Sequence, residues 1–123
     1  RFIATPESSA HDHFKKAILA MGEGDTQLTL KELTPVRLVK NEFYKRVEQA
    51  YDKGASVEDL TALLGRGRAK KGMFEGDLIE GELEVGQISG LIKEIKPAAE
   101  IVKELIDEYR QALNEQTTSK FNF

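Results

Sequence analysis

The stretch Gly76–Leu105 constrains the fold most strongly because its two halves have opposite character. In the first half, apolar residues occur singly between glycines, and no helical stripe of apolar residues persists. Glycine permits backbone conformations and close approaches that other residues resist. The first half therefore predicts a tight loop that lies on another part of the protein. Its glycines are Gly76, Gly81, Gly86 and Gly90.

The second half predicts a long amphipathic helix with Pro97 at its first position. Proline is favoured there because the N–H group that it lacks would have no partner within the helix. The apolar residues follow at steps of three and four, which places them on one helical face. We expect Ile101, Leu105 and Tyr109 on this face to pack inward. The full stripe is Ala98, Ile101, Val102, Leu105, Ile106, Tyr109 and Leu113.

Shorter helices are predicted upstream of this stretch. Ser8 or Ser9 is expected to cap the first of them, because a serine side chain can accept from a free N–H group of the first turn. Ser56 and Asp59 have the spacing of a capping box at the start of another. The expected helices are Ser9–Met21, about Asn41 to Gly54, a short helix after Ser56, and one or two turns within Arg68–Phe74.

Strands are few in this prediction. Thr26–Leu30 alternates polar and apolar residues, which indicates a short strand. The apolar pair Phe2-Ile3 follows Arg1 directly, so we interpret it as the end of a strand and the chain as a possible fragment of a longer protein. The fold class expected is mainly α with one or two short strands. The polar tail Thr117–Phe123 is expected to fray.

Composition narrows the class of protein. The 123 residues suffice for one modest core, and 40% hydrophobic with 32% charged residues indicate a globular chain. The net charge of −3 argues weakly against a duplex DNA binder, which usually has a basic excess. The absence of cysteine excludes disulfides and thiolate metal sites and is compatible with a cytoplasmic protein. No apolar run approaches the length of a membrane span, and no signal peptide is visible.

Two histidines raise the question of a metal site. His11 and His13 are two residues apart, so on a helix their side chains point in different directions. Helical ligand pairs are normally spaced by four residues, and no carboxylate completes a known ligand signature. We therefore favour an exposed or locally hydrogen-bonded pair over a metal site, and we expect no metal.

The concentrated basic patch has two interpretations. Its cations are expected to bind an anion, such as a cofactor phosphate or an acidic partner protein, or to form a solvated surface balanced by Glu75 and Asp77. The second interpretation is favoured because charge runs usually lie on the surface. No glycine-rich phosphate loop is present. The four cations are Arg66, Arg68, Lys70 and Lys71.

Gln87 is the polar residue of greatest interest. It follows Gly86 in a loop whose glycines permit close approach to a flat or bulky group, and its amide can donate and accept at once. The alternative is a loop amide that pairs with nearby backbone groups. Neither interpretation is preferred on the residues alone. The chain offers no serine–histidine–acid pattern and no obvious nucleophile.

The segment GDLIEGELEVGQISGLIKEIKPAAEIVKEL resembles the C-terminal part of the FMN-dependent nitronate monooxygenases, formerly called 2-nitropropane dioxygenases. It is equally similar to enoyl-acyl-carrier-protein reductase II of the same superfamily. The opening RFIATPESSAHDHFKKAIL and the middle blocks PVRLVKN and GRGRAKKGMFEGD also resemble family segments, in the same order. The resemblance extends from Arg1 to about Leu113.

This resemblance implies a place in a (β/α)8 barrel, the TIM barrel, that binds FMN at the C-terminal ends of its strands. Residues 1–22 would be the end of barrel strand 8 and helix 8, with Ser9–Met21 as that helix. Residues 23–116 would form a helical extension packing on the barrel, and residues 117–123 a frayed tail. Gly86 and Gln87 would lie near the flavin. The family's phosphate-binding glycines and catalytic histidine lie upstream of Arg1, so no catalytic residue is expected in this segment.

Two hypotheses about function follow. The first is a C-terminal segment of an FMN-dependent oxidoreductase that either oxidises alkyl nitronates or reduces enoyl thioesters with NAD(P)H. Its partners would be the remainder of the barrel and a small nitronate or acyl-thioester substrate, with no nucleic acid and no membrane. The isolated segment is expected to be inactive and prone to self-association through an exposed apolar patch. The second hypothesis is a stand-alone helical module that binds a partner through the helix Pro97–Gln116 without catalysis.

Overall fold

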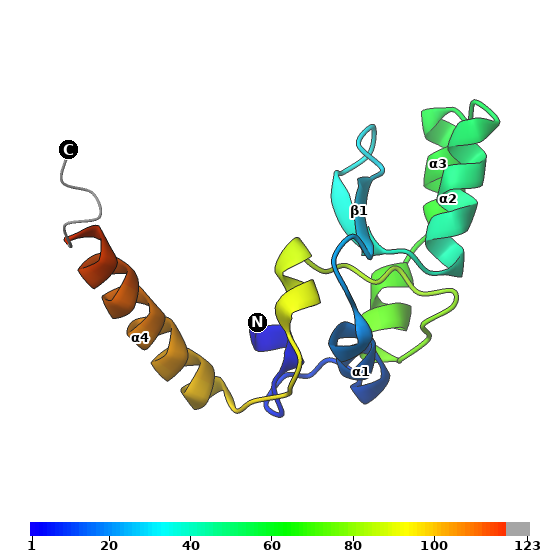
Figure 1. The fold of residues 1–123 in the computed structure, drawn as a ribbon. Helices are drawn as coiled ribbons and strands as arrows, with labels where there is room; N and C mark the ends of the chain where they lie inside the picture. Colours follow the sequence, from blue (N-terminus) through cyan, green and yellow to red (C-terminus); the bar gives the residue numbers. More distant parts are fainter. Residues whose placement is uncertain (118–123) are drawn as a thin grey trace.

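The computed structural model describes residues 1–117 and shows mostly helices around one two-stranded antiparallel sheet (Figure 1). This confirms the predicted fold class. The part of the tail beyond Thr117 lies outside the described residues. The elements in order are η1 (Phe2–Ala4), α1 (Asp12–Ala20), β1 (Thr26–Thr29), β2 (Val36–Val39), α2 (Glu42–Asp52), α3 (Val57–Leu64), η2 (Lys70–Phe74), η3 (Gln87–Leu91) and α4 (Ala98–Gln116).

The N-terminal segment is a turn of 3-10 helix rather than the strand end expected for Phe2-Ile3. The Ala4 N–H group donates to the Arg1 carbonyl at 3.2 Å, and the Thr5 hydroxyl donates to the Phe2 carbonyl at 2.9 Å. These local bonds satisfy the backbone without a neighbouring strand. The strand prediction for this pair is therefore wrong for the chain as the structure shows it.

Helix α1 begins later than predicted because His11, and not Ser8 or Ser9, is its N-cap. The His11 Nδ1 atom accepts from the His13 N–H group at 3.1 Å. The Ser8 hydroxyl accepts instead from the Ala10 N–H group at 3.1 Å, so it shapes the loop that leads into the helix. The expected serine cap is corrected accordingly.

The first hydrophobic core surrounds α1. Phe14 and Ile18 are fully buried, and Leu83 from the glycine-rich segment packs on the same cluster. The close approach predicted for this segment is found at Gly81, where an added Cβ would lie 2.2 Å from the Gly72 Cα atom. The remaining buried members of the cluster are Ala4, Ala10 and Met21.

A second core joins the sheet to α2 and α3. Strands β1 and β2 pair antiparallel with Thr26 opposite Val39, and Leu38 also forms an isolated bridge to Glu84. The predicted helix starts are confirmed, since Asn41 caps α2 and Ser56 and Asp59 form the capping box of α3. The buried members are Leu30, Leu38, Phe43, Tyr44, Val47 and Leu60.

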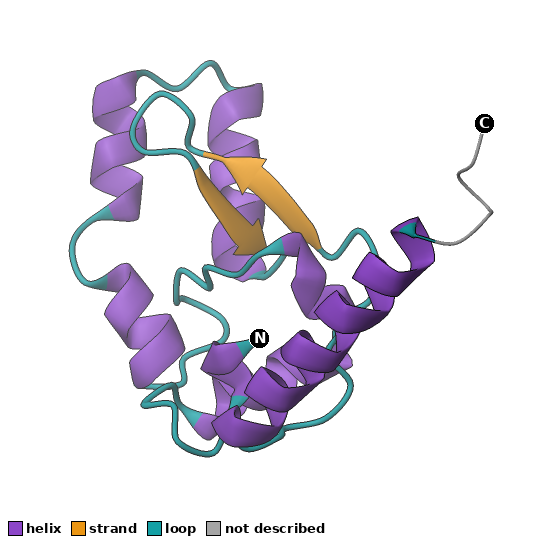
Figure 2. Ribbon diagram, turned by 90° about the vertical axis from the view of Figure 1, so that its left-hand side faces the viewer, coloured by secondary structure: helices purple, strands orange, loops and turns teal. Residues whose placement is uncertain are grey.

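Helix α4 extends away from the other elements in Figure 1, and in Figure 2, which is turned by 90°, it crosses in front of them. Of the predicted inward face only Ile101 is buried, with 5% of its surface exposed, whereas Leu105 is 40% and Tyr109 67% exposed. The inward packing of Leu105 and Tyr109 is therefore wrong for this chain. The other large residues of the stripe are exposed, and none of them belongs to either core cluster within residues 1–117.

The rest of the chain contacts α4 at two places, the N-terminus of the helix and the side chain of Glu108. Pro97 is the N-cap and has no side-chain cap of its own, so the Glu7 carboxylate accepts from the Ala98 N–H group at 3.1 and 3.2 Å. Glu108 accepts two hydrogen bonds from the Arg1 guanidinium, at 3.0 and 3.1 Å. These bonds fix the direction and rotation of the helix and leave its apolar face turned outward.

Candidate functional site

Gln87 lies at the start of η3 and lines a pocket of about 440 Å3. One wall is the turn that follows α1, and another is the sheet, which contributes Thr26 and Arg37. The Gln87 amide is exposed and has no hydrogen-bond partner among residues 1–117. It is therefore available to a group from outside the described chain. The lining residues are Gly22, Glu23, Gly24, Thr26, Arg37, Gln87, Ile88, Gly90 and Leu91.

Gly90 explains how η3 comes so close to the turn. A Cβ atom on Gly90 would lie 2.9 Å from the Gly22 carbonyl oxygen, so any other residue would push the two segments apart. Within η3, the buried Ser89 hydroxyl donates to the Gly86 carbonyl at 2.6 Å and fixes the start of this short helix. The pocket wall is thus held by the close backbone contact at Gly90 together with side-chain hydrogen bonds, such as the bond from Lys93 to the Met21 carbonyl at 2.6 Å.

Gly86 has the opposite surroundings. No atom lies within 4 Å of the position that its Cβ would occupy, and its backbone is extended. Nothing in residues 1–117 therefore requires a glycine here. Space beside Gly86 is open, which fits the predicted approach of a flat group, and that role stays a prediction.

Arg37 is a pocket residue that the sequence reasoning did not single out. Its Nη1 atom donates to the Thr26 carbonyl and to the Thr26 hydroxyl, both at 3.2 Å. These bonds tie the two strands together at the pocket wall. The alternation Val-Arg-Leu-Val after Pro35 was the available signal, because it indicates a strand with Arg37 and Val39 on one face.

The four cations of the basic patch have unlike surroundings. Lys70 pairs with Glu75 at 3.3 Å and Lys71 with Asp77 at 3.2 Å. Arg66 is exposed and has no partner among residues 1–117. The structure does not gather the four cations into one site, and their role in anion or partner binding stays a prediction.

Arg68 has a structural place in the fold. Its guanidinium donates to the carbonyls of Leu64 at 2.8 Å, Glu80 at 2.8 Å and Leu63 at 3.1 Å. It also lies over the Phe43 ring, 4.5 Å from the centroid, in a cation–π contact. This side chain joins the end of α3 to the glycine-rich segment.

The Glu80 carboxylate is the anion next to Arg68. A hydrogen bond from Arg46 is the main cause that lowers the pKa of Glu80, and the charge of Arg68 acts in the same direction against the effect of burial. Both cations therefore favour the ionised carboxylate. The group completes the junction between α2, α3 and the glycine-rich segment.

The two histidines are closer together than their spacing in a helix predicted. Because His11 is the cap and not a helical residue, its ring lies 4.5 Å from the His13 ring in an edge contact. The His13 Nδ1 atom lies 3.2 Å from the Gly76 carbonyl. Among the described residues no group of three or more histidine, aspartate or glutamate side chains could hold a metal ion.

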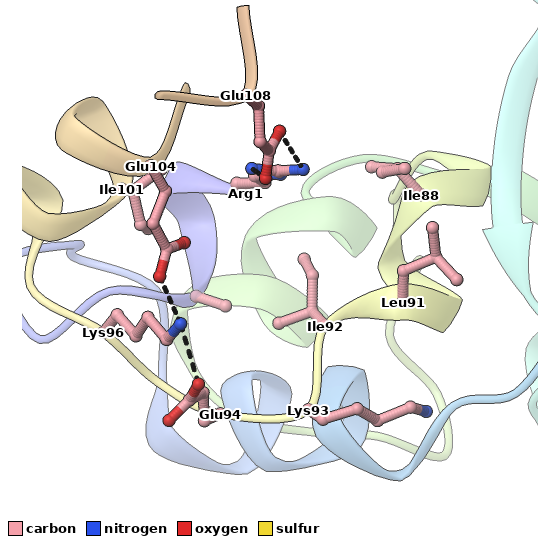
Figure 3. A pocket seen from close by; sticks show the side chains of 11 residues that line it. Arg1, Ile88, Leu91, Ile92, Lys93, Glu94, Lys96, Ile101, Glu104 and Glu108 are labelled. Atoms are coloured by element: carbon pink, nitrogen blue, oxygen red, sulfur yellow. Dashed lines mark hydrogen bonds and ion pairs between the residues drawn. The ribbon is translucent and has the colours of Figure 1, made fainter. Parts of the chain in front are cut away.

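A second pocket, of about 230 Å3, separates η3 from α4 (Figure 3). Its floor includes Ile92 and Ile101, and its rim carries the Arg1–Glu108 pair. The Lys96 ammonium bonds to Glu104 and, at 2.8 Å, to Glu94, and these two bonds raise the pKa of Lys96. The pocket therefore has an apolar floor and a rim whose charges are mostly paired with one another, while the Lys93 ammonium donates to the Met21 carbonyl at 2.6 Å.

Within residues 1–117 no helix is both long and apolar enough to cross a bilayer.

Comparison with known proteins places these features in a family. The family model for nitronate monooxygenase matches residues 1–108. FabK from Thermotoga maritima is 31% identical with a TM-score of 0.77, and the match covers 94% of this chain and 36% of FabK. A point mutant of the same protein is 28% identical with a TM-score of 0.74, covering 94% of this chain and 34% of that chain. The chain therefore spans about a third of the length of these solved chains.

The match covers the whole of the pocket described above, from the turn after α1 to η3. It also agrees with the resemblance drawn from the loop around Gln87 and from the opening and middle segments. The family model extends over most of the 123 residues. The chain belongs to the nitronate monooxygenase family.

Proposed function

We propose that this chain forms the C-terminal part of an FMN-dependent oxidoreductase. The family match over residues 1–108 carries this proposal, supported by the likeness to FabK, an enoyl-acyl-carrier-protein reductase II. The reaction is either the oxidation of alkyl nitronates or the NAD(P)H-dependent reduction of enoyl thioesters. FMN, when bound, supplies the redox chemistry, and the protein positions the reactants and excludes water.

The residues of the pocket suit a place beside a flavin. Open space adjoins Gly86, and the amide of Gln87 is free to donate and accept. In the proposed enzyme Gln87 orients the flavin or its substrate through hydrogen bonds. The groups that hold the flavin phosphate and the catalytic residue belong to the barrel, so the 123-residue chain alone is proposed to be inactive.

The remainder of the barrel is the proposed partner of α4. The solved relatives are about three times as long as the matched segment, and the apolar face of α4 is exposed beyond Ile101 within residues 1–117. Residues 1–22 are proposed to close the barrel and residues 23–116 to pack on it. Burial of Leu105 and Tyr109 would then take place against the barrel.

A chimera tests this proposal. In it, the present chain replaces the matching C-terminal third of FabK from Thermotoga maritima. We expect the chimera to retain FMN and NAD(P)H-dependent enoyl reduction or nitronate oxidation. Gln87→Ala should then alter turnover or the flavin absorption spectrum with little change in melting temperature. Gln49→Ala on the exposed side of α2 is the matched control and should change neither.

The outcomes separate the alternatives. If Gln87→Ala leaves the turnover and the flavin spectrum of a folded, flavin-loaded chimera unchanged, the role proposed for Gln87 is contradicted. The outward face of α4 also fits a second function, a helical interaction module without catalysis. A chimera that folds but retains no FMN would favour that module over the oxidoreductase.

A further inference from the structure

The guanidinium of Arg37 is oriented by hydrogen bonds from one of its nitrogens, while its other two nitrogens have no acceptor within residues 1–117. Its Nη1 atom bonds to the carbonyl and the hydroxyl of Thr26, whose side chain is buried in the wall between the strands. The Nε and Nη2 atoms have no acceptor among residues 1–117. They are also not among the buried polar atoms that lack a partner, so they are open to solvent. Arg37 thus presents one free pair of parallel donors.

Arg37 differs in this respect from most other arginines of the chain. Arg1, Arg46 and Arg68 each form an ion pair with a carboxylate, whereas Arg37 forms none within residues 1–117. Arg110 pairs with Asp107 at 3.8 Å. An arginine that is oriented by a neighbour and lacks a carboxylate has its charge available to a ligand. Parallel donors of this kind match the oxygens of carboxylate or phosphate.

The rest of the pocket could contact the part of the ligand that carries the carboxylate or phosphate group. The exposed side chains of Ile88 and Leu91 lie in the lining, together with the free amide of Gln87. The turn after α1 contributes Gly22 and Gly24, which have no side chains, and Glu23 between them. The pocket therefore combines one oriented cation, one amide and an apolar surface within about 440 Å3.

We propose that this pocket binds the oxyanion of a small molecule, a carboxylate or a phosphate, on the Nε–Nη2 edge of Arg37, with the apolar part of the molecule on Ile88 and Leu91. The ligand chemistry follows from the pocket itself and does not depend on the flavin. Glu23 also lines the pocket, and its carboxylate repels an anion, so we expect the bare ion to bind weakly.

Nuclear magnetic resonance titration of the flavin-free full chain tests the proposal. The probes are inorganic phosphate, acetate and hexanoate, each added at constant ionic strength. Saturable shifts are expected at the amides of Gly24, Gln87 and Gly90. Tighter phosphate than acetate binding would identify a phosphate ligand, and the reverse a carboxylate. Hexanoate should bind at least about fivefold more tightly than acetate, because its chain would cover Ile88 and Leu91.

Substitutions inside and outside the pocket distinguish specific binding at Arg37 from general attraction of anions to positive charge. Arg37→Gln should weaken binding about tenfold or more, because hydrogen bonds to a charged group are lost. Arg66→Gln removes the same charge outside the pocket and should change the affinity by less than about twofold. Arg37→Lys keeps the positive charge but removes the pair of parallel donors. It is used in place of Arg37→Gln if that variant fails to fold.

Three results would overturn the proposal. The first is the absence of saturable shifts at the pocket amides in the wild-type chain. The second is equal weakening by the Arg37 and Arg66 substitutions, which would show general attraction to cations. The third is unchanged affinity in a folded Arg37 variant, which would leave Arg37 only as a tie between β1 and β2. None of these results bears on the flavin, so the oxidoreductase proposal is tested separately.

Discussion

Helices α1 and α4 carry the same kind of apolar stripe but have opposite surroundings. The apolar stripe of α1 packs against other residues of this chain, since Phe14 and Ile18 are fully buried. The stripe of α4 is open beyond Ile101, and the body contacts this helix through charged groups instead. Three- and four-residue spacing therefore predicts that a helix has an apolar face, while the partner of that face depends on long-range contacts.

Loss of the Phe14 ring should have the largest effect. Phe14→Ala leaves a cavity at the centre of the first core, and we expect it to lower the free energy of unfolding by about 3–5 kcal/mol. Chemical denaturation followed by circular dichroism measures the change. A loss below about 1 kcal/mol would mean that α1 is packed no better than α4, which would remove the contrast between them.

Disruption of the close contact between Gly81 and Gly72 should cause the second largest loss of stability. In Gly81→Ala the new methyl group meets the backbone of Gly72 and the Asp77 carbonyl, 2.3 Å away, so the segment must shift. We expect a loss of about 1–3 kcal/mol. Gly86→Ala is the control, because no atom lies near its Cβ position, and it should be close to neutral in the chain alone. Equal effects of the two substitutions would contradict the close contact at Gly81.

Leu105→Ala should have a small effect in this chain. The side chain is 40% exposed, and alanine favours the helix slightly, so we expect a loss of at most about 1 kcal/mol. In the chimera with FabK the same substitution should cost clearly more, if the barrel covers this face. Equal small losses in both settings would argue against the barrel as the partner of α4.

The cap of α4 should respond to acid. A hydrogen bond from its own backbone and a second from the Ala98 N–H group lower the pKa of Glu7. The cap therefore stabilises the helix above the pKa of the unfolded carboxyl, about 4.3, and is lost as pH falls through the lower folded pKa. The Ala98 amide signal should shift over this acid range, and Glu7→Gln should abolish that shift. A shift that persists in Glu7→Gln would assign the acid response to another group.

Local chemistry made much of the fold predictable. The caps Asn41 and Ser56 and the strand Thr26–Leu30 were readable from the sequence because each depends on neighbours a few residues away. The cap of α1 was misplaced because His11 can replace serine as an acceptor. The second strand, Val36–Val39, is not predicted from its residues alone, since its pairing requires the turn at residues 30–35 that connects it to β1.

The candidate site was less predictable because it is built from distant segments. Gln87 could be singled out from its glycine neighbours, but its pocket needs the turn at Gly22 and the strand residue Arg37. Nothing in the local spacing connects these three segments. The outward face of α4 was also beyond the sequence pattern, because the ion pair of Arg1 and Glu108 joins residues at opposite ends of the chain.

The contrast between α1 and α4 is tested most directly by the reactivity of single cysteines. The chain contains no cysteine, so Ile18→Cys on α1 and Ile106→Cys on α4 give clean signals with a thiol reagent under native conditions. Ile18 is fully buried, whereas Ile106 is 46% exposed. We predict that Ile106→Cys reacts at about the rate of the unfolded chain and Ile18→Cys at least about a thousandfold more slowly. Equal protection of both cysteines in dilute solution would show that the face of α4 is covered within this chain, and would contradict the account.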